Sequence, residues 1–186
     1  MGGAVTILNI WHVAFTVGDL ERSIAFYELL GLRLRNTQPQ TNAYTRKLVG
    51  YPDADLRVAF FKLPGGLATN SGHALELIQY LRPTGEPIRP ERYQPGAAHL
   101  AFEVDDLQPE YERLSAAGVA FLSDPVDIVE GVNSGGRTVY LFDPDGITLE
   151  LHQAPPHRRR KEELHDTGVA HRASQPPSTG MIAPDT

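Results

Sequence analysis

Four residues in the sequence have side chains that could together bind a metal ion: His12, Glu76, His99 and Glu150. Each histidine opens a run that predicts a strand, and each glutamate stands between two leucines in another such run. Imidazole and carboxylate groups are nitrogen and oxygen ligands that suit Zn, Ni, Co, Mn or Fe(II). The chain has no cysteine, which excludes thiolate metal sites and a cysteine nucleophile. A single His or Glu in a strand is more often structural, so the metal hypothesis depends on all four residues together.

Strand geometry predicts which way these side chains point. Alternate residues of a strand share a face, so His12 lies with Ala14 and opposite the large apolar residues of its strand. The same rule places His99 with Ala101, and it places each glutamate opposite its flanking leucines. The large apolar face must pack against a helix, which leaves the four polar groups on the uncovered faces. Two imidazoles and two carboxylates there would be costly to desolvate without a cation or protons.

An internal repeat provides a reason for one His and one Glu in each half. Residues 12–34 align without gaps with residues 99–121, and seven of the 23 positions are identical. Each copy predicts a strand, a helix that begins at an aspartate N-cap and ends at a glycine, and a second strand. Further along, RVAFFKLPGG with ALELIQ resembles RTVYLFDPDG with ITLELHQ, and each predicts two more strands joined by a turn. Each half therefore reads as a βαβββ module.

The repeat sets the expected domain organisation. We predict an α+β chain with a first module over residues 1–81, a proline-rich linker over 82–97 and a second module over 98–154. Residues 155–186 are polar and lack periodicity, which predicts a disordered C-terminal tail. The first module has a longer loop before its glutamate, and we expect His73 in that loop to be exposed.

Several motifs resemble the vicinal oxygen chelate superfamily, which includes glyoxalase I, methylmalonyl-CoA epimerase, type I extradiol dioxygenases and the fosfomycin and bleomycin resistance proteins. These motifs are HVAFTV, FYELLGL, ALELIQ, HLAFEVDD and LFDPDGITLEL. The resemblance implies two βαβββ modules forming a curved mixed sheet around one divalent metal ion. It implies His12, Glu76, His99 and Glu150 as the metal ligands. Their presence argues against the metal-free bleomycin-binding branch, whose members lack them.

The resemblance also implies a class of reaction. A shell of two His and two Glu looks most like glyoxalase I and the epimerases, so we expect a metal-dependent isomerase, epimerase or lyase. Such an enzyme transfers a proton next to the metal-chelated carbonyl of a small substrate with adjacent oxygens, and Glu150 or Glu76 would be both ligand and base. The alternatives are a non-haem Fe(II) ring-cleaving or rearranging dioxygenase and a non-catalytic binding or resistance protein. A small polyol ketone or cyclitol fits as well as glutathione or acyl-CoA substrates.

The remaining expectations concern substrate contacts, partners and location. Tyr80, Asn133, Arg137 and His152 are candidates for the substrate pocket. The net charge of −6 argues against nucleic acid as a partner, and no apolar stretch approaches the roughly 18 to 20 residues of a membrane span. We therefore expect a cytoplasmic protein. A homodimer is expected from the short linker and the exposed strand edges, with the modules paired within one chain or across the dimer.

Overall fold

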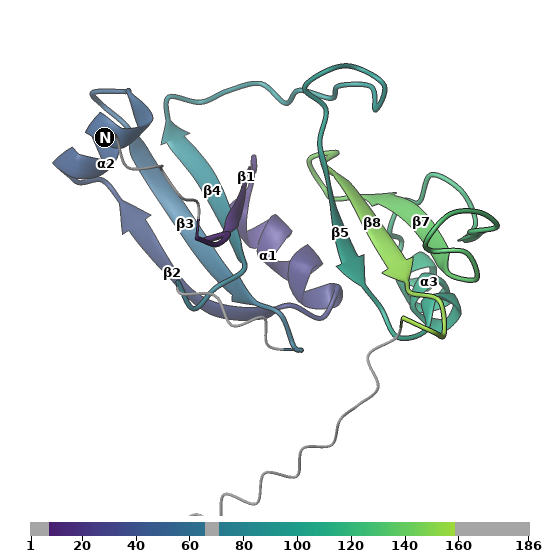
Figure 1. Cartoon of the computed structure of the whole chain (residues 1–186). Helices are drawn as coiled ribbons and strands as arrows, with labels where there is room; N and C mark the ends of the chain where they lie inside the picture. The colour runs from purple at the N-terminus through teal and green to yellow at the C-terminus, as the bar shows by residue number, and fades with distance from the viewer. Residues whose placement is uncertain (1–7, 66–70, 159–186) are drawn as a thin grey trace, which may run out of the picture.

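The computed structural model describes residues 8–65 and 71–158, and in these residues it contains eight strands and three helices (Figure 1). The elements of the first half are β1 (Val13–Thr16), α1 (Leu20–Leu29), β2 (Arg33–Gln40), α2 (Ala43–Val49), β3 (Asp55–Lys62) and β4 (Leu75–Arg82). The elements of the second half are β5 (His99–Glu103), α3 (Leu107–Ala116), β6 (Val126–Asp127), β7 (Arg137–Phe142) and β8 (Thr148–Gln153). None of the described helices has the length and apolar character that a membrane crossing needs.

The strands form two four-stranded mixed sheets of the same topology. Their orders are β1-β4-β3-β2 and β5-β8-β7-β6. In each sheet the first strand runs parallel to the last, and the other neighbours are antiparallel. The predicted α+β class is therefore confirmed. The two sheets remain separate within the chain, because β1 and β5 are outer strands of different sheets.

The ends of the two repeated helices follow the sequence signals. Asp19 accepts a hydrogen bond from the backbone N–H of Arg22 before α1, and Asp106 accepts one from Gln108 before α3. After each helix the chain turns at a glycine with positive φ, +91° at Gly31, where a side chain would be strained.

Two local elements differ from the sequence prediction. The segment between β2 and β3 forms α2, whose N-cap Asn42 accepts a hydrogen bond from the backbone N–H of Thr45. In the second half, the strand expected directly after Gly118 is reduced to one bridge between Phe121 and Leu141, and β6 starts only at residue 126. The two halves therefore differ most in the third element of each repeat, where β2 has eight residues and β6 has two.

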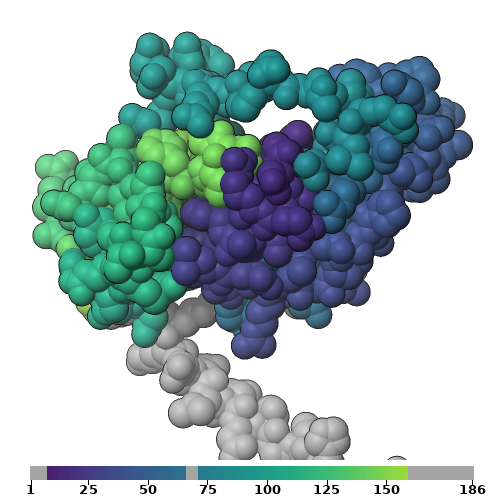
Figure 2. Space-filling view, turned by 180° about the vertical axis from the view of Figure 1, so that it is seen from behind, coloured from purple at the N-terminus to yellow at the C-terminus, as the bar shows by residue number. Residues whose placement is uncertain are grey.

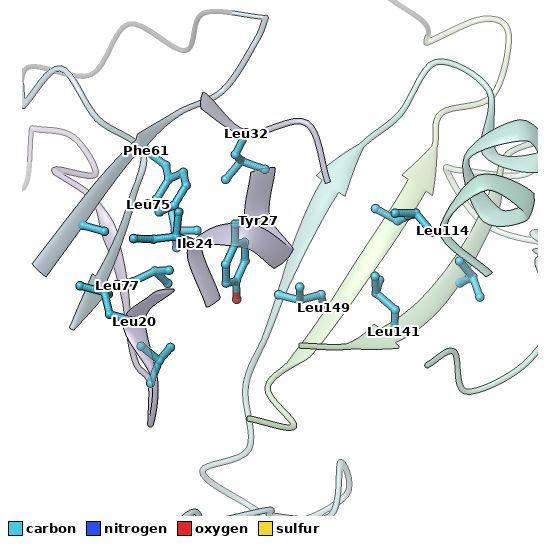
Figure 3. Packing of buried hydrophobic residues seen from close by; sticks show 14 of the residues in the cluster. Leu20, Ile24, Tyr27, Leu32, Phe61, Leu75, Leu77, Leu114, Leu141 and Leu149 are labelled. Carbon is cyan, nitrogen blue, oxygen red and sulfur yellow. The ribbon is translucent and has the colours of Figure 1, made fainter. Parts of the chain in front are cut away.

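One hydrophobic core joins the two halves. It contains Leu75 and Leu77 of β4, Leu149 and Leu151 of β8, and the buried face of α1 around Tyr27 (Figure 3). Helix α1 lies between the two sheets in Figure 1. Because the leucines that flank each glutamate point into this core, Glu76 and Glu150 lie on the sheet faces opposite it.

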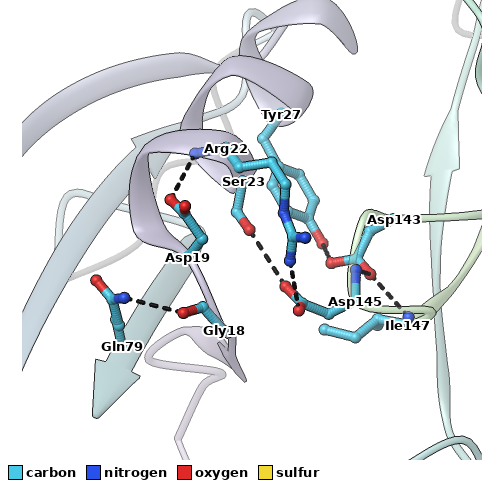
Figure 4. Close-up of polar contacts among 9 residues, drawn as sticks. All are labelled: Gly18, Asp19, Arg22, Ser23, Tyr27, Gln79, Asp143, Asp145 and Ile147. Atoms are coloured by element: carbon cyan, nitrogen blue, oxygen red, sulfur yellow. Dashed lines mark hydrogen bonds and ion pairs between the residues drawn. The ribbon is translucent and has the colours of Figure 1, made fainter. Parts of the chain in front are cut away.

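A polar joint fastens α1 to the turn between β7 and β8 (Figure 4). The buried Tyr27 hydroxyl donates to Asp143 Oδ2 at 3.2 Å, and Arg22 Nη2 lies 2.7 Å from Asp145 Oδ1. A side chain at Gly18 would bring its Cβ to 3.0 Å from the same oxygen of Asp145, so the close approach favours glycine there.

Seen from behind, the segment between β4 and β5 crosses over the top of the two joined halves (Figure 2).

Asp143 in this joint should give the protein a measurable pH dependence of stability. Burial raises the pKa of the Asp143 carboxyl, although hydrogen bonds from the backbone of Ile147 and Asp145 oppose the shift. The folded state therefore binds this proton more tightly than the unfolded state. The resulting stabilisation is complete below the unfolded pKa of about 4 and is lost as pH rises through the raised folded pKa.

We expect the free energy of unfolding of the wild type, relative to Asp143→Asn, to decrease as pH rises from about 4 toward neutrality. Asparagine keeps the side-chain size but cannot ionise, so the comparison isolates this carboxyl. Urea unfolding of both proteins over a pH series measures the difference. If the free energy of unfolding of the wild type, relative to Asp143→Asn, increased with pH, the raised pKa of Asp143 would be contradicted.

Candidate metal centre

The first His–Glu pair lies on the face of the first sheet that points away from the hydrophobic core. His12 Nε2 is 3.1 Å from Glu76 Oε2. The pairing of β1 with β4 places Ala14 beside Glu76, so His12, two residues before Ala14, shares that face. Glu76 is only 9% exposed. Burial raises the pKa of its carboxyl, and the nearby His12 imidazole opposes this rise.

The second pair repeats the first at the equivalent register. His99 Nε2 is 3.2 Å from Glu150 Oε2. The pairing of β5 with β8 places Ala101 beside Glu150, as Ala14 lies beside Glu76 in the first sheet. The internal repeat therefore extends from the sequence to the geometry of the two pairs.

The surroundings of the two carboxylates differ in polarity. Phe60 lies across from Glu76 on β3, whereas Tyr140 lies across from Glu150 on β7. The Thr138 hydroxyl donates to Glu150 Oε1 at 2.6 Å, and His152 Nδ1 lies 3.5 Å from the same oxygen. Glu150 is thus held in one orientation by polar neighbours, while Glu76 sits in a more apolar setting.

We expect Thr138→Val to lower kcat/KM about 10-fold or more, because Thr138 orients Glu150, which the sequence predicts to be a metal ligand, and loss of such an orienting residue typically costs 10–100-fold. Valine has nearly the same shape as threonine but lacks the hydroxyl that fixes Glu150. Thr138→Ser keeps the hydroxyl and should restore most of the activity. Steady-state kinetics of both variants test this; a loss of activity in Thr138→Ser with none in Thr138→Val would show that the methyl group matters instead.

His73 was predicted to be exposed, and this prediction is wrong: only 9% of the residue is exposed. Its ring stacks on His12 with a centroid separation of 5.1 Å and meets the ring of Phe60 at 4.6 Å. Burial lowers the pKa of the His73 imidazole, and a backbone hydrogen bond at Ser71 opposes this. Sequence reasoning missed this residue because it lies in a loop, where strand alternation says nothing about direction. The greater length of the loop was the available signal.

His12, His73 and Glu76 form a group of potential ligands whose nitrogen and oxygen atoms all lie within 4.8 Å of one another. Among the described residues no other cluster of three or more such side chains meets this limit. His99 and Glu150 lie outside the group. The four ligands expected from the sequence are therefore present as two separate pairs in one chain.

The predicted substrate residues fall into two sets. Tyr80 lies on the face of Glu76, four residues further along β4, and His152 lies on the face of Glu150. Burial raises the pKa of the Tyr80 hydroxyl. Arg137 instead lies on the helix side of its sheet, where it pairs with Asp127 and donates to Gln108 of α3.

Asn133, in the loop before β7, accepts a hydrogen bond from Arg158 at 2.7 Å. The structure therefore brings Tyr80 and His152 to the His–Glu faces. It gives Arg137 and Asn133 partners elsewhere.

Several known proteins are similar to this chain. A 2-epi-5-epi-valiolone epimerase from Actinomyces sp is 38% identical over 158 residues, which cover 82% of this chain and 81% of that protein. A lactoylglutathione lyase from Haemophilus influenzae is 32% identical over 150 residues, which cover 77% of this chain and 91% of that protein. The crystal structure of a glyoxalase family protein from Bacillus cereus has a TM-score of 0.68 at 21% identity, covering 81% of this chain and 97% of that one.

The match to the family extends over both modules. Residues 9–151 match the model of the Glyoxalase/Bleomycin resistance protein/Dioxygenase superfamily. This range includes both His–Glu pairs and the segment between them. This confirms the resemblance to the vicinal oxygen chelate proteins. The chain belongs to the Glyoxalase/Bleomycin resistance protein/Dioxygenase superfamily.

Proposed function

We propose that this protein is a divalent-metal-dependent epimerase, isomerase or lyase that transfers a proton next to the carbonyl of a small polyoxygenated substrate. The observation that carries the proposal is the repeated His–Glu pair, 3.1 Å apart in one sheet and 3.2 Å apart in the other, at the same register. The similarity to an epimerase and to lactoylglutathione lyases supports this type of reaction. Among these reactions we favour epimerisation, since the epimerase has the higher identity of the two relatives described above.

The donor set fits a divalent cation. His12, Glu76, His99 and Glu150 would supply two nitrogen and two oxygen ligands, and such a shell leaves positions open for a substrate. The buried Nδ1 atom of His12 has no hydrogen-bond partner among the described residues, and Glu76 is largely desolvated. A cation on this face would offset the cost of burying these groups. When bound, the ion would act as a Lewis acid and acidify the C–H beside a chelated carbonyl.

The chain's own residues would orient the substrate and move the proton. Either Glu76 or Glu150 would accept the proton at a carboxylate oxygen and return it, as general base catalysis requires. The hydroxyl of Thr138 fixes one oxygen of Glu150, which leaves Oε2 on the side of His99. Tyr80, Tyr140 and His152 add polar groups to the two faces that could bind substrate hydroxyls.

We propose a homodimer in which the first pair of one chain meets the second pair of the other. The two pairs point away from the single core that joins the halves, so they cannot face each other across it. Leu8, Ile10 and Trp11 lead into edge strand β1 and are exposed, and β5 is also an edge strand. Exposed apolar residues beside an open strand edge favour an interface with a second chain.

For the substrate we propose a polyhydroxylated ketone. The name of the Actinomyces relative describes an epimerase of a valiolone. Two arginines that could bind a phosphate or carboxylate are already paired with acidic side chains: Arg57 contacts Glu21 and Arg137 contacts Asp127. The row of Asn36, Gln38 and Gln40 on β2 shares the face of Glu76 and offers neutral hydrogen-bonding groups.

Solvent isotope exchange tests the proposal. The purified metal-loaded protein is incubated in D₂O with polyhydroxylated cyclic ketones, and deuterium is followed by NMR. We expect one deuterium to appear at the carbon next to the carbonyl, together with inversion at that centre. Turnover without exchange of that hydrogen would refute proton transfer, and oxygen consumption would instead support the dioxygenase alternative. Binding without any reaction would support the non-catalytic alternative.

A further inference from the structure

A ring nitrogen of His73 lies close to the first His–Glu pair. Its ring lies nearly parallel to that of His12, with an interplanar angle of 25°. A nitrogen of each ring and an oxygen of Glu76 lie within 4.8 Å of one another. A shift of about 1 Å or less would bring three such atoms to the mutual distances seen around a metal with bonds near 2.1 Å.

The loop that carries His73 is tied to the segment that leads into β1 and carries His12. The hydroxyl of Ser71 lies 2.6 Å from the carbonyl oxygen of Trp11, to which it donates, and it accepts from the backbone N–H of His73 at 3.4 Å. Arg35 Nη1 donates to the carbonyl of Ser71 at 3.1 Å. These contacts fix the position of His73 relative to the residue immediately before His12.

The second half has no equivalent of this arrangement. Glu76 comes twelve positions after Pro64, whereas Glu150 comes six positions after Pro144, so the loop that carries His73 is specific to the first half. The position equivalent to His73, three residues before Glu150, is an isoleucine, Ile147. Among the described residues, His99 and Glu150 belong to no group of three ligands within the same limit.

We propose that His73 is a third metal-binding side chain, so that the first half of each chain holds a divalent ion through His12, His73 and Glu76. The second His–Glu pair then completes the site. This inference rests on the proposed metal dependence and adds an asymmetry to it: the first half binds the ion with three donors and the second with two. The ion therefore stays with the first half when the second pair is disabled.

Cobalt binding to the full-length protein tests the proposal. Co²⁺ is titrated into metal-free wild type, His73→Phe and the matched control His157→Phe, whose histidine is exposed. Phenylalanine keeps the ring contacts with His12 and Phe60 but removes the nitrogen donor. We expect His73→Phe to weaken Co²⁺ binding by at least the ~10–100-fold that loss of a supporting residue costs, and to change the visible absorption bands. His157→Phe should match the wild type.

Two further measurements separate the possible outcomes. His99→Phe should still bind Co²⁺, whereas the double variant His73→Phe/His99→Phe should bind far more weakly than either single variant. In the wild type, NMR of ¹⁵N-histidine-labelled protein should show strongly shifted ring signals from His73 as well as from His12 and His99, and this readout needs no variant to fold. Wild-type affinity and absorption in His73→Phe would overturn the role of His73 alone. Failure of the wild type to bind Co²⁺, Zn²⁺, Ni²⁺, Mn²⁺ or Fe²⁺ would overturn the proposed function itself.

Discussion

Replacing either Glu76 or Glu150 with glutamine should lower kcat/KM by about 1000-fold, within the 10²–10⁴-fold range for loss of a general acid or base. The amide has the same size as the carboxylate, but it carries no charge for a metal ion and cannot accept the substrate proton. Both residues are expected to matter because each stands next to a histidine at the same register of its sheet. The measurement is steady-state kinetics with metal content determined in parallel.

Glu103→Gln is the matched control for these variants. Glu103 is exposed on β5 and lies beside His152 in the strand register, on the same face as Glu150. It makes no ion pair among the described residues, so its replacement should change kcat/KM less than about threefold. If Glu76→Gln keeps both its metal and its activity while Glu150→Gln loses them, the proton acceptor is Glu150 and the first carboxylate has no catalytic role.

The positions of the two His–Glu pairs could be predicted from the sequence because strand alternation is a local rule. Once Leu75 and Leu77 are assigned to the buried face, Glu76 must point the other way, whatever the rest of the fold does. The same holds for Glu150 between its leucines. The aspartate caps and glycine ends of α1 and α3 are equally local, and they were predicted correctly.

Features that depend on tertiary contacts could not be predicted in this way. His73 is buried because the hydroxyl of Ser71 ties its loop to the carbonyl of Trp11. Ser71 and Trp11 are 60 residues apart in the sequence. Arg137 shares strand β7 with Thr138 but points to the helix side, where Gln108 and Asp127 bind it. An arginine suggested a substrate contact. Because Arg137 directly precedes Thr138 in the strand, however, its side chain must point to the face opposite Thr138 and Glu150.

The joint between the halves determines where the two pairs can meet. Tyr27, Arg22 and Ser23 of α1 bind the turn between β7 and β8, so the helix side of the first half is fastened to the second half. The buried faces of both sheets are used within the chain, and the two His–Glu faces remain outside. A second copy of the chain can supply the missing pair to each of them, which closes two equivalent sites by twofold symmetry.

Mixing two inactive variants should therefore restore activity. A Glu76→Gln chain keeps an intact second pair, and a Glu150→Gln chain keeps an intact first pair. In a mixed dimer one site receives both intact pairs and the other receives both altered pairs. Random pairing of equal amounts places half of the chains in mixed dimers with one working site of two, so we expect about one quarter of wild-type activity.

The test is to unfold and refold the two variants together, or to co-express them with different tags, and to compare the mixture with each variant alone. Recovery near a quarter of wild-type activity requires that each site draws its pairs from different chains. If the pairs of one chain met each other instead, every chain in the mixture would still carry one altered carboxylate in its own site. The mixture would then be no more active than the average of the two variants, and this result would exclude the exchanged dimer while leaving the metal site and its chemistry in place.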